Sequence, residues 1–77
     1  MAKARFIVAA EDGRWTVSSG GGFRKAFDSR SEALREAVES AHRSGLEGNE
    51  ALALALDEKN ELYPVWVYGQ DALLTSD

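Results

Sequence analysis

A chain of 77 residues with a formal net charge of −4 is long enough for one folded domain and no more. Hydrophobic residues make up 44% and charged residues 29%, as in ordinary globular proteins, and the lack of cysteine excludes disulfides and thiolate metal sites. No run approaches the ~20 apolar residues of a membrane span, so we expect a cytoplasmic protein that has no membrane partner.

The first predicted elements are two strands joined by a tight hairpin. Residues 4–10 form the first strand, and residues 14–18 alternate polar and apolar side chains as a half-buried second strand does. Between them, Asp12-Gly13 is typical of a type I′ turn, which needs positive φ at both central positions. A two-residue turn pairs Val8 with Val17, whereas a three-residue turn would scatter the shared apolar face.

Residues 18–22, Ser-Ser-Gly-Gly-Gly, lead into a short third strand over residues 23–27. The backbone amides of such a loop can cradle a phosphate, and Arg24 and Lys25 follow closely. A phosphate loop, however, leads into a helix N-terminus, and here the glycines lead into a strand. A flexible hairpin connection is the favoured interpretation.

A capping box begins the single predicted helix. The Ser29 hydroxyl can accept a hydrogen bond from the backbone amide of Glu32, whose carboxylate reaches back to the cap. The helix should run over residues 30–44 and end at Gly45, acting as a left-handed cap. Its narrow apolar stripe consists of Ala33, Leu34, Ala37, Val38 and Ala41.

Residues 51–56 alternate alanine and leucine, which favours helix by propensity but strand by its period of two. We favour a strand, because residues 57–60 are typical of a hairpin turn into a final strand over residues 62–68. Within that last strand Pro64 has no amide donor, which predicts an edge strand or a break. We expect Leu52, Leu54 and Leu56 to face the core, and Ala51, Ala53 and Ala55 to face the other way.

These elements predict an α+β domain over residues 4–69, in the order β-β-β-α-β-β. Its sheet should be five-stranded, mixed or antiparallel, with one helix packed on one face. A right-handed crossover would set the fourth strand parallel to the first and third. Residues 70–77 are expected to form a disordered tail.

Several short motifs resemble those of a family of small bacterial domains, catalogued as domain of unknown function twenty-one eighty-eight. They are Asp12-Gly13-x-Trp15-x-Val17, Phe27-Asp28-Ser29-x-x-Glu32-Ala33, Asp57 with its acidic turn, and Tyr68-Gly69. The chain departs from the family pattern at Asn60 and in residues 18–22. The resemblance covers about residues 6–69 and implies a compact helix-on-sheet domain. It implies no activity and no functional residues.

No combination of residues in the chain is typical of catalysis, of a metal site or of a cofactor site, so we expect neither an enzyme nor a cofactor. His42 is the single histidine and lies in the last helical turn, where a structural role suits the helix dipole. Asp57, Glu58 and Glu61 lack the spacing of a calcium loop, and a solvated turn explains them better.

One helix covers one face of a sheet, so the other face is the candidate interface. Its last strand has apolar residues on both sides, contributing either Tyr63, Val65 and Val67 or Trp66 and Tyr68, and an exposed apolar patch usually marks an interface. The candidate interface residues are Arg5, Ile7, Arg14, Thr16, Arg24, Tyr63, Val65, Trp66, Val67 and Tyr68.

Two functions follow from this face. The first is a protein-interaction or self-association module, most simply a homodimer through the sheet face or edge, because small domains gain core by associating. The alternative is a nucleic-acid-binding module that uses Arg5, Arg14 and Arg24 together with nearby aromatic residues. The acidic net charge disfavours nucleic acid, whose phosphates need a basic surface.

Overall fold

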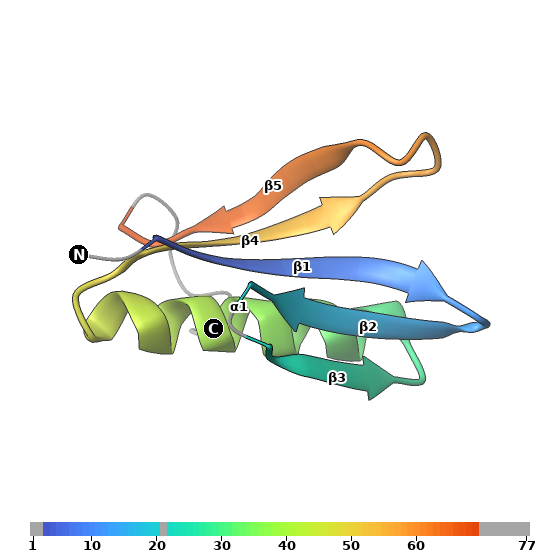
Figure 1. Cartoon of the computed structure of the whole chain (residues 1–77), viewed down its shortest axis with the longest axis horizontal. Coiled ribbons are helices and arrows are strands. Elements are labelled where there is room, and N and C mark those ends of the chain that lie inside the picture. The colour runs from blue at the N-terminus through green and yellow to red at the C-terminus, as the bar shows by residue number, and fades with distance from the viewer. Residues whose placement is uncertain (1–2, 21, 70–77) are drawn as a thin grey trace.

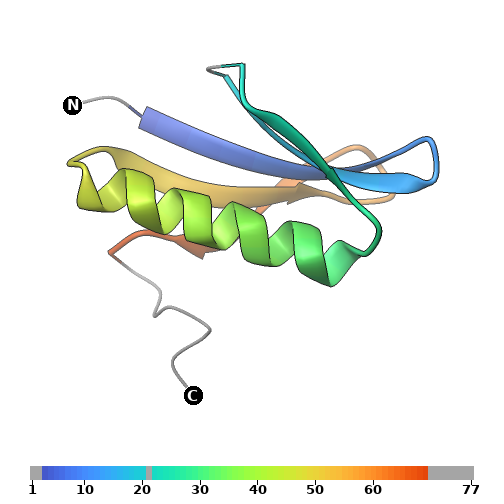
Figure 2. The same ribbon diagram turned by 90° about the horizontal axis from the view of Figure 1, so that it is seen from below.

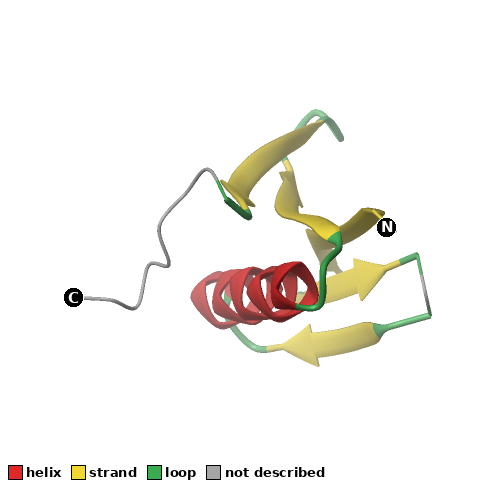
Figure 3. Ribbon diagram, turned by 90° about the vertical axis from the view of Figure 1, so that its left-hand side faces the viewer, coloured by secondary structure: helices red, strands yellow, loops and turns green. Residues whose placement is uncertain are grey.

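The computed structural model of the chain describes residues 3–20 and 22–69. In chain order its elements are β1 (Lys3–Glu11), β2 (Arg14–Ser19), β3 (Arg24–Phe27), α1 (Arg30–Leu46), β4 (Glu50–Leu56) and β5 (Leu62–Val67). The strands form one five-stranded mixed sheet in the order β3-β2-β1-β4-β5, and α1 packs on one face of it (Figures 1 and 3). This confirms the predicted α+β fold; the predicted tail over residues 70–77 lies outside the described residues.

The β1–β2 hairpin has the two-residue turn that its sequence predicts. Asp12 and Gly13 have φ angles of 51° and 80°, so both central residues adopt the left-handed conformation of a type I′ turn. Val8 pairs with Val17 as expected. Both valines are almost completely buried beneath α1, at 1% and 0% exposure.

Helix α1 begins as predicted and ends later. The backbone amide of Glu32 donates to the Ser29 hydroxyl over 3.2 Å, which caps the N-terminus. The prediction that Gly45 ends the helix is wrong, because the left-handed residue is Gly48, with a φ of 99°. The amides of Gly48 and Asn49 donate to the carbonyls two and three residues before the cap, over 3.0 and 3.2 Å, forming a Schellman motif.

Gly45 lies inside the last helical turn for a packing reason. The Tyr68 ring rests directly on its backbone, in the space that a Cβ atom would occupy. The glycine therefore allows the chain beyond β5 to lie close to the helix, and it has no role in ending the helix.

Strand β4 runs parallel to β1 and antiparallel to β5, as the predicted crossover requires. The prediction of its two faces is wrong. Phe6 pairs with Ala53 and Val8 with Ala55, so the alanines lie on the side of the sheet that the helix covers. Ala51, Ala53 and Ala55 are at most 4% exposed, and the leucines of β4 point to the opposite side.

The core lies between α1 and the sheet, and its centre is made of small side chains. Ala33, Ala37 and Ala41 of the helix are 0% exposed and lie in one cluster with the alanines of β4. Trp66, at 2% exposure, fills one flank, and Phe6, Trp15, Phe23 and Phe27 pack against the other side of the cluster. Small residues let the helix backbone approach the central strands closely, so bulky side chains are confined to the flanks.

Strand β5, which contains Pro64, lies at the edge of the sheet, as the lack of a backbone amide donor at this proline predicts. Its pairing with β4 is irregular: Ala53 pairs with Trp66, but the next residue, Leu54, pairs with Pro64, which leaves Val65 as an extra residue in a β-bulge. Within residues 3–20 and 22–69, no helix is long and apolar enough to cross a membrane.

Candidate functional site: the open face of the sheet

We call the side of the sheet opposite α1 the open face, because no described element covers it (Figures 1 and 2). The strand registers place every second side chain on it. Its uncharged members are Ile7, Ala9, Thr16, Ser18, Ala26, Leu52, Leu54, Leu56, Leu62, Pro64 and Val67, and its arginines are Arg5, Arg14 and Arg24.

The centre of the open face is a row of leucines along β4, flanked by apolar residues of the neighbouring strands. Ile7 lies beside Leu54, and Leu54 in turn lies beside Pro64 on the edge strand. Leu54 is only 8% exposed although it lies outside the core cluster, so its neighbours on this face enclose it. Leu62, at the end of the row, is 47% exposed. The open face therefore carries an apolar layer of its own, with a solvent-facing border.

One hydroxyl group on the open face, that of Thr16, is satisfied internally. Thr16 is 6% exposed, and its Oγ1 donates to the carbonyl of Ala9 over 3.3 Å. A partner that binds here would not displace water from the Thr16 hydroxyl. Burying this hydroxyl in an apolar contact therefore adds no large desolvation cost.

The three arginines of the open face differ in their pairing. Arg14 Nη2 lies 3.2 Å from a carboxylate oxygen of Asp28, and Arg24 pairs with Glu11 on the neighbouring hairpin. Arg5 makes no ion pair within the described part of the chain. Two of the three guanidinium groups are therefore already paired with carboxylates, and the third, that of Arg5, is uncompensated within the described residues.

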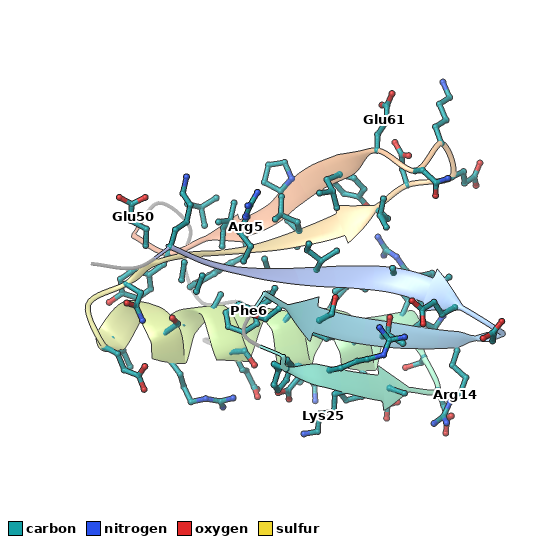
Figure 4. The ribbon with its side chains drawn as sticks, viewed as in Figure 1. Arg5, Phe6, Arg14, Lys25, Glu50 and Glu61 are labelled. Atoms are coloured by element: carbon teal, nitrogen blue, oxygen red, sulfur yellow. The ribbon has the colours of Figure 1, made fainter. Side chains whose placement is uncertain are left out.

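Arg5 borders a shallow groove at the start of β1. The groove has a volume of about 490 Å³ and is lined by Lys3, Ala4, Arg5, Ile7, Ser19 and Gly20, none of which is acidic. Glu50 of β4 stands next to Lys3 in the parallel register of β1 and β4. Figure 4 shows Glu50 and Arg5 at the same end of the sheet. This end of the open face therefore has two cations and one nearby carboxylate.

Four predicted interface residues lie on the helix side instead. Trp66 is 2% exposed, and its ring centroid is 6.2 Å from that of Tyr68 and 6.1 Å from that of His42. The Tyr63 hydroxyl accepts a hydrogen bond of 2.8 Å from Arg30 of the helix. Val65, the bulged residue, packs against the core cluster. The bulge explains these placements, because it changes the alternation along β5 so that Trp66 and Tyr63 both face the helix while Val67 faces outward.

The other candidate residues of the sequence make contacts that support the fold. His42 packs in the aromatic cluster just described, and in the loop of residues 18–22 the Ser19 amide donates to the Phe23 carbonyl over 3.0 Å. The Asp57 carboxylate accepts hydrogen bonds from the amides of Lys59 and Glu61, at 2.8 and 2.9 Å, and so holds its turn together. The described residues contain no group of three side chains that could hold a metal ion.

Sequence reasoning missed the leucines of β4, together with Leu62, Pro64 and Lys3, as members or neighbours of the open face. The signal was available in part. The helix stripe is rich in alanine, and a close helix needs small residues opposite it, which favours the alanines of β4 beneath the helix.

Comparison with known proteins gave no match: no family model, no curated protein and no solved structure is similar enough to this chain to be assigned to it.

Proposed function

We propose that this domain is a self-association module whose open face binds a second copy of the chain. The observation that supports it is the row of Ile7, Leu52, Leu54, Leu56 and Leu62, which no element covers within residues 3–20 and 22–69. An apolar patch that is contiguous across strands is typical of an interface. A domain of this size buries only roughly 60% of its unfolded surface, so a second copy adds core that it otherwise lacks.

The face is a better contact than either edge of the sheet. On the β3 edge, Arg24 and Lys25 are both exposed, and charged side chains discourage strand addition. On the β5 edge, Pro64 removes a donor and the bulge at Val65 breaks the ladder. Both edges therefore carry the features by which natural sheets avoid edge-to-edge pairing, whereas the leucine row of the face carries none of them.

Nucleic-acid binding stays an untested alternative, and no observation favours it. Of its three arginines, Arg14 and Arg24 already pair with carboxylates, so a phosphate would have to compete with Asp28 and Glu11. The net charge of −4 also repels the negatively charged phosphates of a nucleic acid.

The experiment compares the two large apolar side chains that are most exposed among residues 3–20 and 22–69. Leu62, at 47% exposure, lies on the open face, and Leu46, at 66%, lies at the end of α1. We expect the wild-type mass in sedimentation equilibrium to rise toward that of a dimer between low and high micromolar concentration. Leu62→Lys should remain monomeric, because it places a charge in the contact, and Leu46→Lys should associate as the wild type does.

Circular dichroism and thermal unfolding of Leu62→Lys would establish that the variant is folded. A wild-type chain that is monomeric throughout the concentration range overturns the proposal, as does equal weakening by both lysine variants. A monomer in which the methyl groups of Leu52 and Leu54 show nuclear Overhauser contacts to residues 70–77 would overturn it as well. Such contacts would mean that the chain's own C-terminal segment covers the open face.

A further inference from the structure

On the helix side of the sheet, one stripe of α1 faces the edge strand β5. At four-residue spacing this stripe consists of Arg30, Leu34, Val38, His42 and Leu46. Arg30 donates a hydrogen bond of 2.8 Å to the Tyr63 hydroxyl, and the His42 ring centroid lies 6.1 Å from that of Trp66. Because both of these stripe residues contact β5, the residues between them face β5 as well.

Apolar side chains along this boundary still reach solvent. Leu34 of the helix and Val65 of β5 pack against the core cluster and are only half-buried. Leu46 is 66% exposed, the highest value for a large apolar residue within residues 3–20 and 22–69. The helix packs mainly over β4, β1 and β2, and Figure 3 shows β5, the strand that leads into the grey trace, set apart from it. We call Leu34, Leu46, Tyr63, Val65 and Tyr68 the β5 flank.

The chain leaves the fold at one end of the β5 flank. The Tyr68 ring rests on Gly45, the residue before Leu46, so the chain passes the end of the helix here. Gly69 follows with a φ of 87°, a left-handed conformation that occurs in turns and that glycine adopts without strain. Residue 70 therefore begins beside the most exposed apolar residue of the flank, at a point where the chain turns.

The residues that follow have a composition suited to this flank. Residues 70–77 contain one apolar run, Ala72-Leu73-Leu74, between polar residues. Leu73 and Leu74 are four and five residues beyond Gly69, which gives them a reach of up to about 13–18 Å. Along the helix axis, Leu34 lies roughly 16 Å from Gly45. The two leucines can therefore reach the middle of the flank.

The other surfaces near this exit suit the apolar run less well. Adding residues 70–77 to the edge of β5 as a sixth strand requires backbone donors, and Pro64 lacks one while the bulge at Val65 breaks the ladder. The leucine row of the open face lies on the other side of the sheet from Tyr68, so the chain would have to pass around the sheet to reach Leu54. The β5 flank lies on the side from which the chain leaves.

We infer that residues 70–77 turn back at Gly69 and bind the β5 flank of the same copy, with Leu73 and Leu74 packing against Leu34 and Val65. This contact completes the core on its β5 side and leaves the open face free. The inference does not rest on the proposed self-association, because the flank and the open face lie on opposite sides of the sheet.

The direct test is a nuclear Overhauser measurement on the full chain carrying Leu62→Lys, whose open face should not associate, so that every contact arises within one copy. We expect contacts from the methyl groups of Leu73 and Leu74 to those of Leu34 and Val65. The absence of such contacts from both leucines would overturn the inference. Contacts to the open-face leucines of β4 instead would overturn both this inference and the proposed function.

The second test replaces Leu73 and Leu74 together by serine, which changes none of the described residues. We expect the equilibrium constant for unfolding, measured in urea on dilute chain, to rise roughly tenfold, because two apolar side chains lose their burial. The control is Leu62→Ser on the open face, which should change this constant by no more than about twofold.

Both results are required. If the double serine variant unfolds no more readily than the control, the β5 flank is not covered by residues 70–77 and the inference is wrong. Sedimentation equilibrium of the wild type separates this failure from that of the proposed function: a chain that dimerises without the flank contacts loses only this inference, and a monomeric chain with the flank contacts loses only the self-association.

Discussion

The two faces of this sheet are built from different sizes of side chain. The face under α1 has alanines at its centre, with Ala53 at 0% exposure, and large aromatic residues only at its flanks. The open face has leucines at its centre, of which Leu54 is 8% exposed without any helix above it. At the centre of the sheet, therefore, the small residues lie where the helix backbone approaches most closely, and the leucines lie on the side that no described element covers.

The largest effect should come from enlarging the covered face. Ala53→Leu adds three carbons at a position with no exposure beneath the helix, and overpacking of this kind costs about 1–3 kcal/mol or more. Urea unfolding of the wild type and the variant measures the change. An unchanged midpoint for Ala53→Leu would mean that the alanines do not face the helix.

A smaller effect of unusual sign is expected at Gly45. Gly→Ala in a helix normally stabilises by about 1 kcal/mol. Here the new methyl group meets the Tyr68 ring, so we expect Gly45→Ala to destabilise the domain by about 1–2 kcal/mol. The same substitution in a Tyr68→Ala background should recover its normal stabilising effect.

This double-mutant cycle isolates the contact between the helix and the chain beyond β5. Equal effects of Gly45→Ala in both backgrounds, measured by thermal or urea unfolding, would show that the ring does not press on the helix. Gly48, whose φ is positive, serves as a control: Gly48→Ala should destabilise both backgrounds equally, because its effect is in the backbone.

The smallest effect should be at the border of the open face. Leu62→Ser removes an apolar side chain that is already 47% exposed, and we expect the monomer stability, measured under conditions where the chain is dilute, to change by less than about 0.5 kcal/mol. Its consequence should appear in self-association instead. A loss of stability comparable to that of Ala53→Leu would show that Leu62 belongs to the fold and not to an interface.

Much of the fold follows from local patterns. Asp12-Gly13 determines the hairpin and its register, Ser29 caps the helix, and Pro64 indicates an edge strand; all three are confirmed. Such features depend on residues a few positions apart, so the sequence carries them directly. The end of the helix was misplaced because two glycines lie near it, and only the contact of Gly45 with Tyr68 distinguishes them.

The candidate site was predicted less well, for a reason specific to β-sheets. Arg5, Ile7, Arg14, Thr16, Arg24 and Val67 do lie on the open face. The misplaced residues of β5, Tyr63, Val65 and Trp66, and Tyr68 just beyond it, surround a bulge whose position depends on pairing with β4. A shift of one residue moves every following side chain to the other face, so an error in one pairing changes the composition of the whole surface.

Alternation along β4 by itself establishes that its alanines and leucines lie on opposite sides of a strand, because successive side chains point in opposite directions. Which set lies beneath the helix was decided only by the parallel register with β1, in which Ala53 stands beside Phe6 and Ala55 beside Val8. That register brings together residues more than forty positions apart, and the close approach of an alanine-rich helix selects it. Local sequence therefore determined the elements, and long-range packing determined which side of them remains open.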